Sequence, residues 1–393
     1  MRSLGGTRGH AAAAMIAVAV ASLGGGCLLT IPFDALDDSP DAGDAQSLDV
    51  VGLDTSLGEV GGPCETPCPM GTCRADLGGG SSACEIATSL RKPRLGLSVD
   101  TKNAYWTTLC GELQKKPLGG GATETLYTRD GAVFGGLATD GVSATWADKK
   151  NRVVFLMPLS GAAGLTTIVP PADASFTTPI DVAIGHSGSI YWLGGYDVWS
   201  VARDGGVPGT PVELVRSTGP SAALAVREPR VGWALAGRDG LDAGGVRTFD
   251  LDAGEEASTP LFDGPSTVRV ITVDEARWYW GSDDGTISTA AYGGGPVRVI
   301  ARDQGTPNGI AVDEGFAYWT TRGSGTDGTL RRANKFGSAD ATNAVTTYVT
   351  GRAFPAQVVV TSAYIYWLDE GADDPTSCAD PAAAAGSVER VNK

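Results

Sequence analysis

Seven tryptophans recur at similar spacing over residues 95–393, and each closes a short apolar run. A typical copy has an apolar strand ending in aspartate, then a turn, then an aromatic-Trp pair, as in Ile310–Asp313 followed by Tyr318-Trp319. The steps from one tryptophan to the next range from 39 to 48 residues. A period of about 40 to 50 residues that holds several short strands is typical of propeller blades. The seven are Trp106, Trp146, Trp192, Trp233, Trp280, Trp319 and Trp367.

Each repeat holds four strands of alternating polarity, separated by turn residues such as Asp204-Gly205-Gly206 and Asp284-Gly285. One small twisted sheet cannot bury both of its faces, but radial stacking against the next sheet does so. The sequence therefore predicts an all-β fold, a β-propeller of seven four-stranded blades over residues 81–393. The fourth copy has Gly232 before its tryptophan instead of an aromatic residue. If that copy is not a blade, the ring has six.

The two ends of the repeat region predict a closed ring. The seventh copy stops after its third strand, Ser387–Val391, and a strand-like segment, Ala83–Leu90, precedes the first copy. We expect this segment to supply the missing fourth strand, because closure removes an exposed sheet edge. Cys110 and Cys378 both follow the tryptophan of blades that closure makes neighbours, which predicts a disulfide between them.

The N-terminus has the features of an export signal. Arg2 and Arg8 precede a short apolar run, Ala11–Leu23, which is too short to span a bilayer. Leu23–Cys27 resembles a bacterial lipobox, although its leucine stands four residues before the cysteine. The resemblance implies lipidation of Cys27, removal of residues 1–26 and an outer-membrane lipoprotein. Ordinary signal cleavage, giving a secreted or periplasmic protein, is the alternative.

Residues 27–80 are expected to form an acidic, disordered tether with a small Cys-rich segment. Positions 28–80 carry ten acidic residues and one basic residue, Arg74, and offer little apolar surface to bury. An even number of cysteines in an exported chain indicates disulfides. Four cysteines remain besides Cys27, Cys110 and Cys378, and the disulfide pairing among these four stays open. A metal site formed by the first three of them is the alternative. These four are Cys64, Cys68, Cys73 and Cys84.

The repeats resemble a known group of propellers. Ile310–Asp313, Tyr318–Thr321 and Gly328–Arg332 look like one YWTD-type or NHL-type repeat, and residues 90–393 are similar to the TolB-like superfamily. The resemblance concerns the fold and implies no particular activity.

By analogy of fold, ligands bind over the channel mouth, on the face of the second-to-third-strand loops and the inter-blade loops. Mixed charge with an aromatic residue there suits a protein or saccharide ligand, and ordinary solvated loop charges are the alternative. The candidate ligand-binding residues are Asp148, Lys149, Tyr196, Arg238, Asp283, Asp284, Arg322 and Asp369. By contrast, Asp100, Asp140, Asp274 and Asp313 recur at strand ends and are expected to cap turns.

The sequence offers little for catalysis. Its two histidines are His10, in the signal, and His186, in a turn expected on the opposite face. A streptogramin lyase also uses a seven-bladed ring but would need a histidine on the ligand face. The alternative to a non-enzymatic binding or scaffold protein is a calcium-dependent hydrolase or lactonase using Asp283, Asp284 or Asp369. Otherwise no cofactor is expected, and the net charge of −15 argues against nucleic-acid binding.

Overall fold

The computed structural model describes residues 73–74, 83–169, 178–216, 220–237, 244–253, 258–337, 344–371, 378 and 385–393. They belong to one unit of the chain, residues 59–393. Residues 1–58, with the predicted signal and Cys27, lie outside the described part. None of the described residues forms a helix with the length and apolarity that a membrane span needs.

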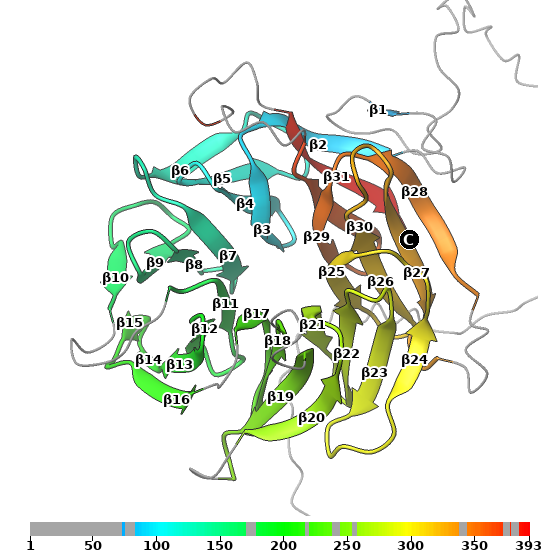
Figure 1. The fold of residues 1–393 in the computed structure, drawn as a ribbon. Helices are drawn as coiled ribbons and strands as arrows, with labels where there is room; N and C mark the ends of the chain where they lie inside the picture. The colour runs from blue at the N-terminus through cyan, green and yellow to red at the C-terminus, as the bar shows by residue number, and fades with distance from the viewer. Residues whose placement is uncertain are drawn as a thin grey trace, which may run out of the picture. The chain divides into compact units, whose positions relative to one another are not determined.

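Seven antiparallel sheets surround a central axis, each with four main strands (Figure 1). Blade 1 has β3 (Pro93–Val99), β4 (Asn103–Thr108), β5 (Glu112–Pro117) and β6 (Glu124–Thr128). Blade 2 has β7 (Phe134–Thr139), β8 (Ser143–Asp148), β9 (Val153–Pro158) and β10 (Thr166–Ile168). Blade 3 has β11 (Asp181–Ile184), β12 (Ile190–Leu193), β13 (Asp197–Val201) and β16 (Val212–Arg216), plus a hairpin of β14 (Arg203–Asp204) and β15 (Val207–Pro208).

The remaining blades follow the same order from the axis outwards. Blade 4 has β17 (Ser221–Arg227), β18 (Arg230–Leu235), β19 (Gly244–Asp250) and β20 (Thr259–Gly264). Blade 5 has β21 (Val268–Val273), β22 (Arg277–Ser282), β23 (Ile287–Ala291) and β24 (Arg298–Ala301). Blade 6 has β25 (Pro307–Val312), β26 (Phe316–Thr321), β27 (Gly328–Asn334) and β28 (Thr346–Arg352). The predicted seven-bladed propeller is confirmed.

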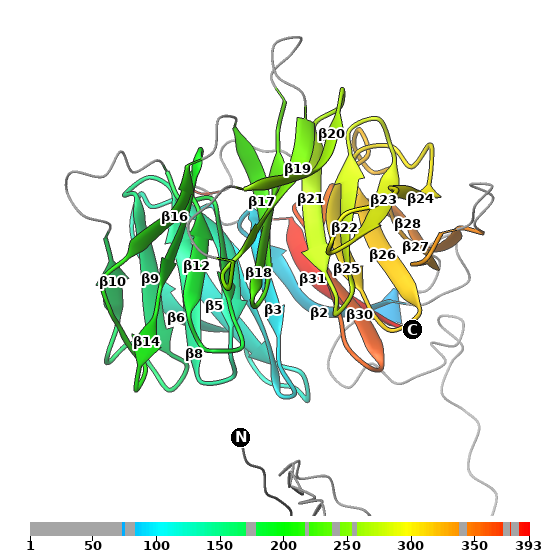
Figure 2. The ribbon, with the colours of Figure 1, turned by 90° about the horizontal axis from the view of Figure 1, so that it is seen from below.

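Blade 7 combines both ends of the repeat region. Its strands are β29 (Pro355–Val360), β30 (Tyr364–Asp369), β31 (Gly386–Asn392) and, on the outside, β2 (Ala83–Leu90). The short β1 (Cys73–Arg74) pairs with β2 in turn. The prediction that an N-terminal strand completes the last blade is therefore confirmed. Figure 2 shows the strands of this ring from the side.

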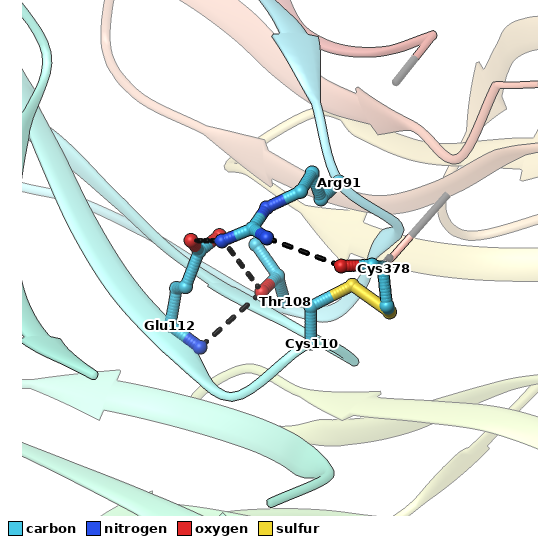
Figure 3. Close-up of a disulfide and its surroundings, with 5 residues drawn as sticks. All are labelled: Arg91, Thr108, Cys110, Glu112 and Cys378. Carbon is cyan, nitrogen blue, oxygen red and sulfur yellow. Dashed lines mark hydrogen bonds and ion pairs between the residues drawn. A yellow bond between two sulfur atoms is a disulfide. The ribbon is translucent and has the colours of Figure 1, made fainter. Parts of the chain in front are cut away.

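A disulfide joins the blades on either side of the closure, as predicted (Figure 3). Cys110 lies between β4 and β5, Cys378 lies between β30 and β31, and their Cα atoms are 5.3 Å apart. Beside it, the Arg91 guanidinium donates to the carbonyl of Cys378 at 3.3 Å and forms an ion pair with Glu112. Cys84 is also disulfide-bonded, but Cys64 and Cys68 lie outside the described residues, and of Cys73 only the backbone is described.

Aromatic side chains from successive blades fill the seams. In five seams a tyrosine from one second strand packs in the same cluster as the tryptophan from the next: Tyr105 with Trp146, Tyr191 with Trp233, Tyr279 with Trp319, Tyr318 with Trp367, and Tyr366 with Trp106. All seven repeat tryptophans are fully buried. Large buried rings contribute strongly to stability, and replacing such a residue with alanine typically costs about 3–5 kcal/mol.

The irregular fourth repeat has a steric cause. A Cβ atom on Gly232 would lie 2.4 Å from the ring of Trp278, which comes from β22 in the next blade. Trp278 and Trp280 share one cluster at this seam. The extra indole therefore takes the space that a tyrosine would fill, and blade 4 is a full blade.

The recurring aspartates cap turns, as predicted. One oxygen of each carboxylate accepts backbone N–H groups of the following turn, as at Asp313, which accepts from Gly315 and Phe316 at 2.8 Å. In three blades the other oxygen accepts the tyrosine hydroxyl of the second strand. These pairs are Tyr105–Asp100 at 2.9 Å, Tyr279–Asp274 at 2.7 Å and Tyr318–Asp313 at 2.8 Å. The Val-Asp and Tyr-Trp elements of the repeat are thus parts of one hydrogen-bonded turn.

Asp313 should make the fold sensitive to acid. Burial opposes its charge, but hydrogen bonds from Lys393, Phe316, Tyr318 and Gly315 lower its pKa from 3.8 to about 2. Because the folded pKa is depressed, the stabilisation is present above about pH 4 and is lost as the pH falls towards 2. We expect Asp313→Asn to lower the free energy of unfolding by about 1 kcal/mol at pH 7, after allowing for solvent screening.

Urea unfolding at pH 7 and pH 2.5 checks this, with Asp130→Asn at an exposed position as the control. The Asp313→Asn effect should shrink at pH 2.5, and an effect of equal size at both pH values would contradict the explanation.

Candidate binding site at the channel mouth

The innermost strands of all seven blades surround a cavity of about 760 Å³. Its residues come from the starts of β3, β7, β11, β17, β21 and β25, from Gln357 on β29, and from loops that connect second to third strands. This is the face on which a ligand is expected by analogy of fold. About half of the lining residues are aliphatic, but polar atoms form the larger part of the exposed wall, and five of the lining residues are charged. The charged lining residues are Arg94, Lys149, Asp181, Arg269 and Asp283.

Lys149 and Asp181 form the partly buried polar centre of this cavity. Lys149 follows β8, and burial, together with the positive charge of Arg94, lowers the pKa of its ammonium, while Asp181 opposes the shift. No described residue hydrogen-bonds or ion-pairs with that ammonium. Gly135 permits its position, because a Cβ atom there would lie 3.0 Å from Lys149 Cε.

Asp181 begins β11 and is held by backbone amides. The N–H groups of Val182 and Leu224 each donate to its carboxylate at 2.9 Å, so the residue links blades 3 and 4. Burial raises its pKa to about 6, although these two N–H groups and Lys149 favour the charged form. Its raised pKa and its position in the cavity wall make Asp181 a candidate functional residue.

The other charges of the mouth are paired. Arg269 forms an ion pair with Asp283. Arg94 Nε lies 3.3 Å from Glu370 Oε1, and Arg322 Nη2 lies 3.8 Å from the other oxygen of that carboxylate. These pairs leave Lys149 as the charged lining residue without a direct partner in the described part of the chain.

The structure brings two of the eight predicted site residues into the cavity wall, Lys149 and Asp283. Arg322 does not line the cavity, but it pairs with Glu370, which also pairs with the lining residue Arg94. The Arg322 guanidinium lies 4.9 Å from the centre of the Phe354 ring. Tyr196 is partly buried in the β12–β13 loop and is not part of the wall. Arg238 lies outside the described residues.

The other three predicted residues serve the fold. Asp148 is fully buried and accepts hydrogen bonds from the backbone and side-chain amides of Asn151. Asp284 caps its own turn by accepting from the N–H and hydroxyl groups of Thr286. The buried Asp369 accepts from Arg352 Nε at 2.7 Å.

The calcium alternative involved Asp283, Asp284 and Asp369, and each of these carboxylates has a different internal partner. Among the described residues, no group of three or more histidine, cysteine or acidic side chains could hold a metal ion. The geometry therefore gives no support to a calcium site at these three residues.

The sequence did not single out Arg94, Asp181 or Arg269. They lie on first strands, where we expected only core. A charged residue at the start of an innermost strand is the signal that could have identified them.

His186 lies at the opposite end of the blades, in the β11–β12 turn. A second cavity of about 520 Å³ is found there, lined partly by His186, Asp140 and Glu228. Glu228 Oε2 lies 3.2 Å from His186 Nδ1 and accepts the N–H of Ser187 at 2.8 Å. Its other oxygen accepts the hydroxyls of Ser187 and Tyr191, both at 2.6 Å.

Glu228 replaces a capping aspartate that blade 3 lacks. Gly185 stands at the end of β11, where four other blades have aspartate, and a Cβ atom there would lie 2.1 Å from Glu228 Oε1. The carboxylate that caps this turn and binds its tyrosine is therefore supplied by blade 4. This arrangement accounts for the cluster around His186 by turn capping.

Two single variants and their combination test whether Glu228 takes the place of the missing capping aspartate. We expect Glu228→Ala to cost about 1–3 kcal/mol, because it leaves polar groups of the turn without an acceptor. Gly185→Asp should also destabilise, because the new side chain collides with Glu228. The double variant should recover most of the loss, since the new aspartate can cap its own turn. Urea unfolding measures all three, and a double variant as unstable as the two single losses combined would contradict the replacement.

No family model matches this chain, and no curated protein matches it. Solved structures do. Virginiamycin B lyase from Staphylococcus aureus superposes with a TM-score of 0.59 at 13% identity, covering 79% of this chain and 98% of that one. U3-55K gives 0.59 at 14% identity, covering 79% and 98%. YCF48 bound to D1 peptide gives 0.56 at 12% identity, covering 79% and 96%.

The likeness is one of fold. The superpositions support the seven-bladed propeller fold. At sequence identities this low, they do not transfer an activity to this chain. Propellers with different functions share the architecture, so the function of this chain has to be argued from its own site.

Proposed function

We propose that this chain is a non-enzymatic binding or scaffold protein, tethered to the cell envelope, whose ligand binds at the channel mouth. The observation that carries the proposal is the cavity of about 760 Å³, lined by all seven blades on the face of the second-to-third-strand loops. Its volume is in the range of small-ligand sites, and its wall combines aliphatic side chains with convergent polar groups. A propeller of the same fold, YCF48, has been solved with a peptide bound, which supports a protein ligand by analogy.

Binding is favoured over catalysis by the placement of the titratable groups. The histidine of the described region, His186, lies on the opposite face, in a turn that Glu228 caps. In the cavity, Asp181 is held by two backbone N–H groups and Arg269 holds Asp283. No nucleophile with an adjacent base is found among the lining residues, which is the arrangement that covalent catalysis needs.

A variant that fills the cavity tests the proposal. Ala222 lines the wall, and Ala222→Trp places an indole in it. Val142 is 75% exposed in the β7–β8 turn on the opposite face, so Val142→Trp is a matched control. In pull-downs from envelope fractions, partners captured by the wild type should be lost with Ala222→Trp and kept with Val142→Trp. Equal capture by both variants would refute binding at the mouth, provided both unfold at the wild-type temperature.

The tether is proposed to be a lipid on Cys27. The lipobox-like segment Leu23–Cys27 supports it, as does the acidic stretch that separates this cysteine from the blades. Radiolabelled palmitate should enter the wild type and not the Cys27→Ser variant. Equal labelling of both proteins would refute the anchor.

A further inference from the structure

On the premise of the proposed mouth site, we propose that its ligand presents a carboxylate on an aliphatic body, and that this carboxylate binds between Lys149 and Arg94. The inference names the chemistry of the ligand and rests on three features of the cavity: an ammonium without a partner among the described residues, a second cation on the neighbouring blade, and aliphatic side chains next to both.

The ammonium of Lys149 is the first feature. It lines the cavity, is partly withdrawn from water, and has no hydrogen bond or ion pair within the described part of the chain. Withdrawing a charge from water without pairing it is unfavourable. Asp181 attracts it only at longer range, because both oxygens of that carboxylate accept backbone N–H groups. An anion from outside would supply the missing partner.

Arg94 is the second feature. It lines the same cavity as Lys149, from the neighbouring blade. Burial lowers the pKa of Lys149 and the positive charge of Arg94 adds to this effect, so the two cations repel each other. Glu370 offsets part of the Arg94 charge, but it is shared with Arg322. A ligand carboxylate has two oxygens and could accept from both cations, which would turn their repulsion into two favourable contacts.

The wall around this pair is the third feature. Leu95 follows Arg94, Leu137 lies on the same blade as Lys149, and Ile180 precedes Asp181; all three line the cavity. No aromatic side chain is found among the described lining residues. Aliphatic surface next to a cation pair suits an apolar body that ends in a carboxylate, and it gives a saccharide no ring to stack on.

The remaining charged groups of the cavity do not compete for this position. Arg269 and Asp283 neutralise each other, and Asp181 is held by its two N–H donors. The charges of the five lining residues leave a net excess of one positive charge for the ligand.

Two sources share this chemistry, a peptide C-terminus and a small aliphatic acid. Calorimetry on the full mature protein separates them with three probe pairs: N-acetyl-leucine against N-acetyl-leucinamide, hexanoate against hexanamide, and a hexapeptide ending in leucine with a free or an amidated C-terminus. We expect each carboxylate to bind at least tenfold more tightly than its amide. The hexapeptide binds most tightly if the source is a polypeptide, and hexanoate does so if it is a small acid.

Two neighbouring lysines supply the variants. Lys149→Met should remove the preference for the carboxylate, as should Arg94→Met, while Lys150→Met at an exposed position should keep it. Thermal unfolding of each variant shows that it is folded. Equal binding of acid and amide, or an equal loss with Lys149→Met and Lys150→Met, would overturn the inference. If no carboxylate binds while Ala222→Trp still abolishes capture from the envelope, this inference fails and the mouth site stands; if Ala222→Trp has no effect, the mouth site fails as well.

Discussion

Replacing Arg352 with methionine is expected to lower the free energy of unfolding by about 3–5 kcal/mol. Arg352 ends β28 and is 3% exposed. Its guanidinium forms ion pairs with Asp369 of β30 and Glu389 of β31, so it joins blade 6 to the closing blade. Burial disfavours its charge, but these two carboxylates raise its pKa. Without the guanidinium, these two buried carboxylates lose the cation that they share.

The pH dependence distinguishes this cause from lost packing. Protonation of the two carboxylates removes their repulsion, so the loss in Arg352→Met should shrink when unfolding is measured at pH 4 instead of pH 8. Arg227→Met is the control, because Arg227 and Glu275 form an exposed ion pair whose removal should have little effect. A loss in Arg352→Met that is the same at both pH values would show that packing, not charge, is responsible.

Removing the Cys110–Cys378 disulfide is expected to cost about 2–5 kcal/mol. The two cysteines are 268 residues apart in the sequence, so the bond restricts the unfolded chain strongly. Chemical unfolding of Cys110→Ala/Cys378→Ala measures the loss. Each single variant should lose about as much as the double, because either change removes the same bond.

In the double variant, the strands that close the ring in blade 7 should also open more often than the rest of the propeller. Hydrogen exchange should speed up in β2 and β31 before it does so in blades 3 and 4, because the bond joins blades 1 and 7. Uniform acceleration over all blades would contradict a role confined to the closure.

The sequence predicted those parts of the fold that repeat or that lie at its ends. The regular spacing of the tryptophans indicated the blades. The last repeat lacks its fourth strand, which indicated that β2 closes the ring. The disulfide followed, because closure places Cys110 and Cys378 on neighbouring blades. The capping aspartates were predictable because the turn that each one caps follows it directly in the sequence.

What the sequence did not reveal depends on contacts between blades. Trp278 fills the place left by Gly232, Glu228 replaces the aspartate that Gly185 displaces, and Arg352 neutralises Asp369 from another blade. These partners are about 17 to 46 residues apart, and no local pattern marks them. For the same reason, charge in a loop does not by itself indicate which residues line the cavity, because Asp148 and Asp369 bind other residues of the fold.

The site itself was predicted as a face and only partly as residues. Analogy of fold pointed to the face that holds the cavity, and two of the predicted loop residues, Lys149 and Asp283, line its wall. The first strands supply most of the wall, and their charged residues, Arg94 and Asp181, could not be recognised until the ring showed which strand starts converge on the axis.

Photo-crosslinking from each face of the propeller tests most directly whether the mouth is the binding surface. A benzophenone side chain is introduced at Leu109, in the cavity wall, or at Val142, in a turn on the opposite face, and envelope fractions are irradiated. The proposed site predicts a specific adduct from Leu109 that is lost when Ala222→Trp fills the cavity, and none from Val142. An adduct that forms from Val142 and not from Leu109 would place the ligand on the other face and contradict the account.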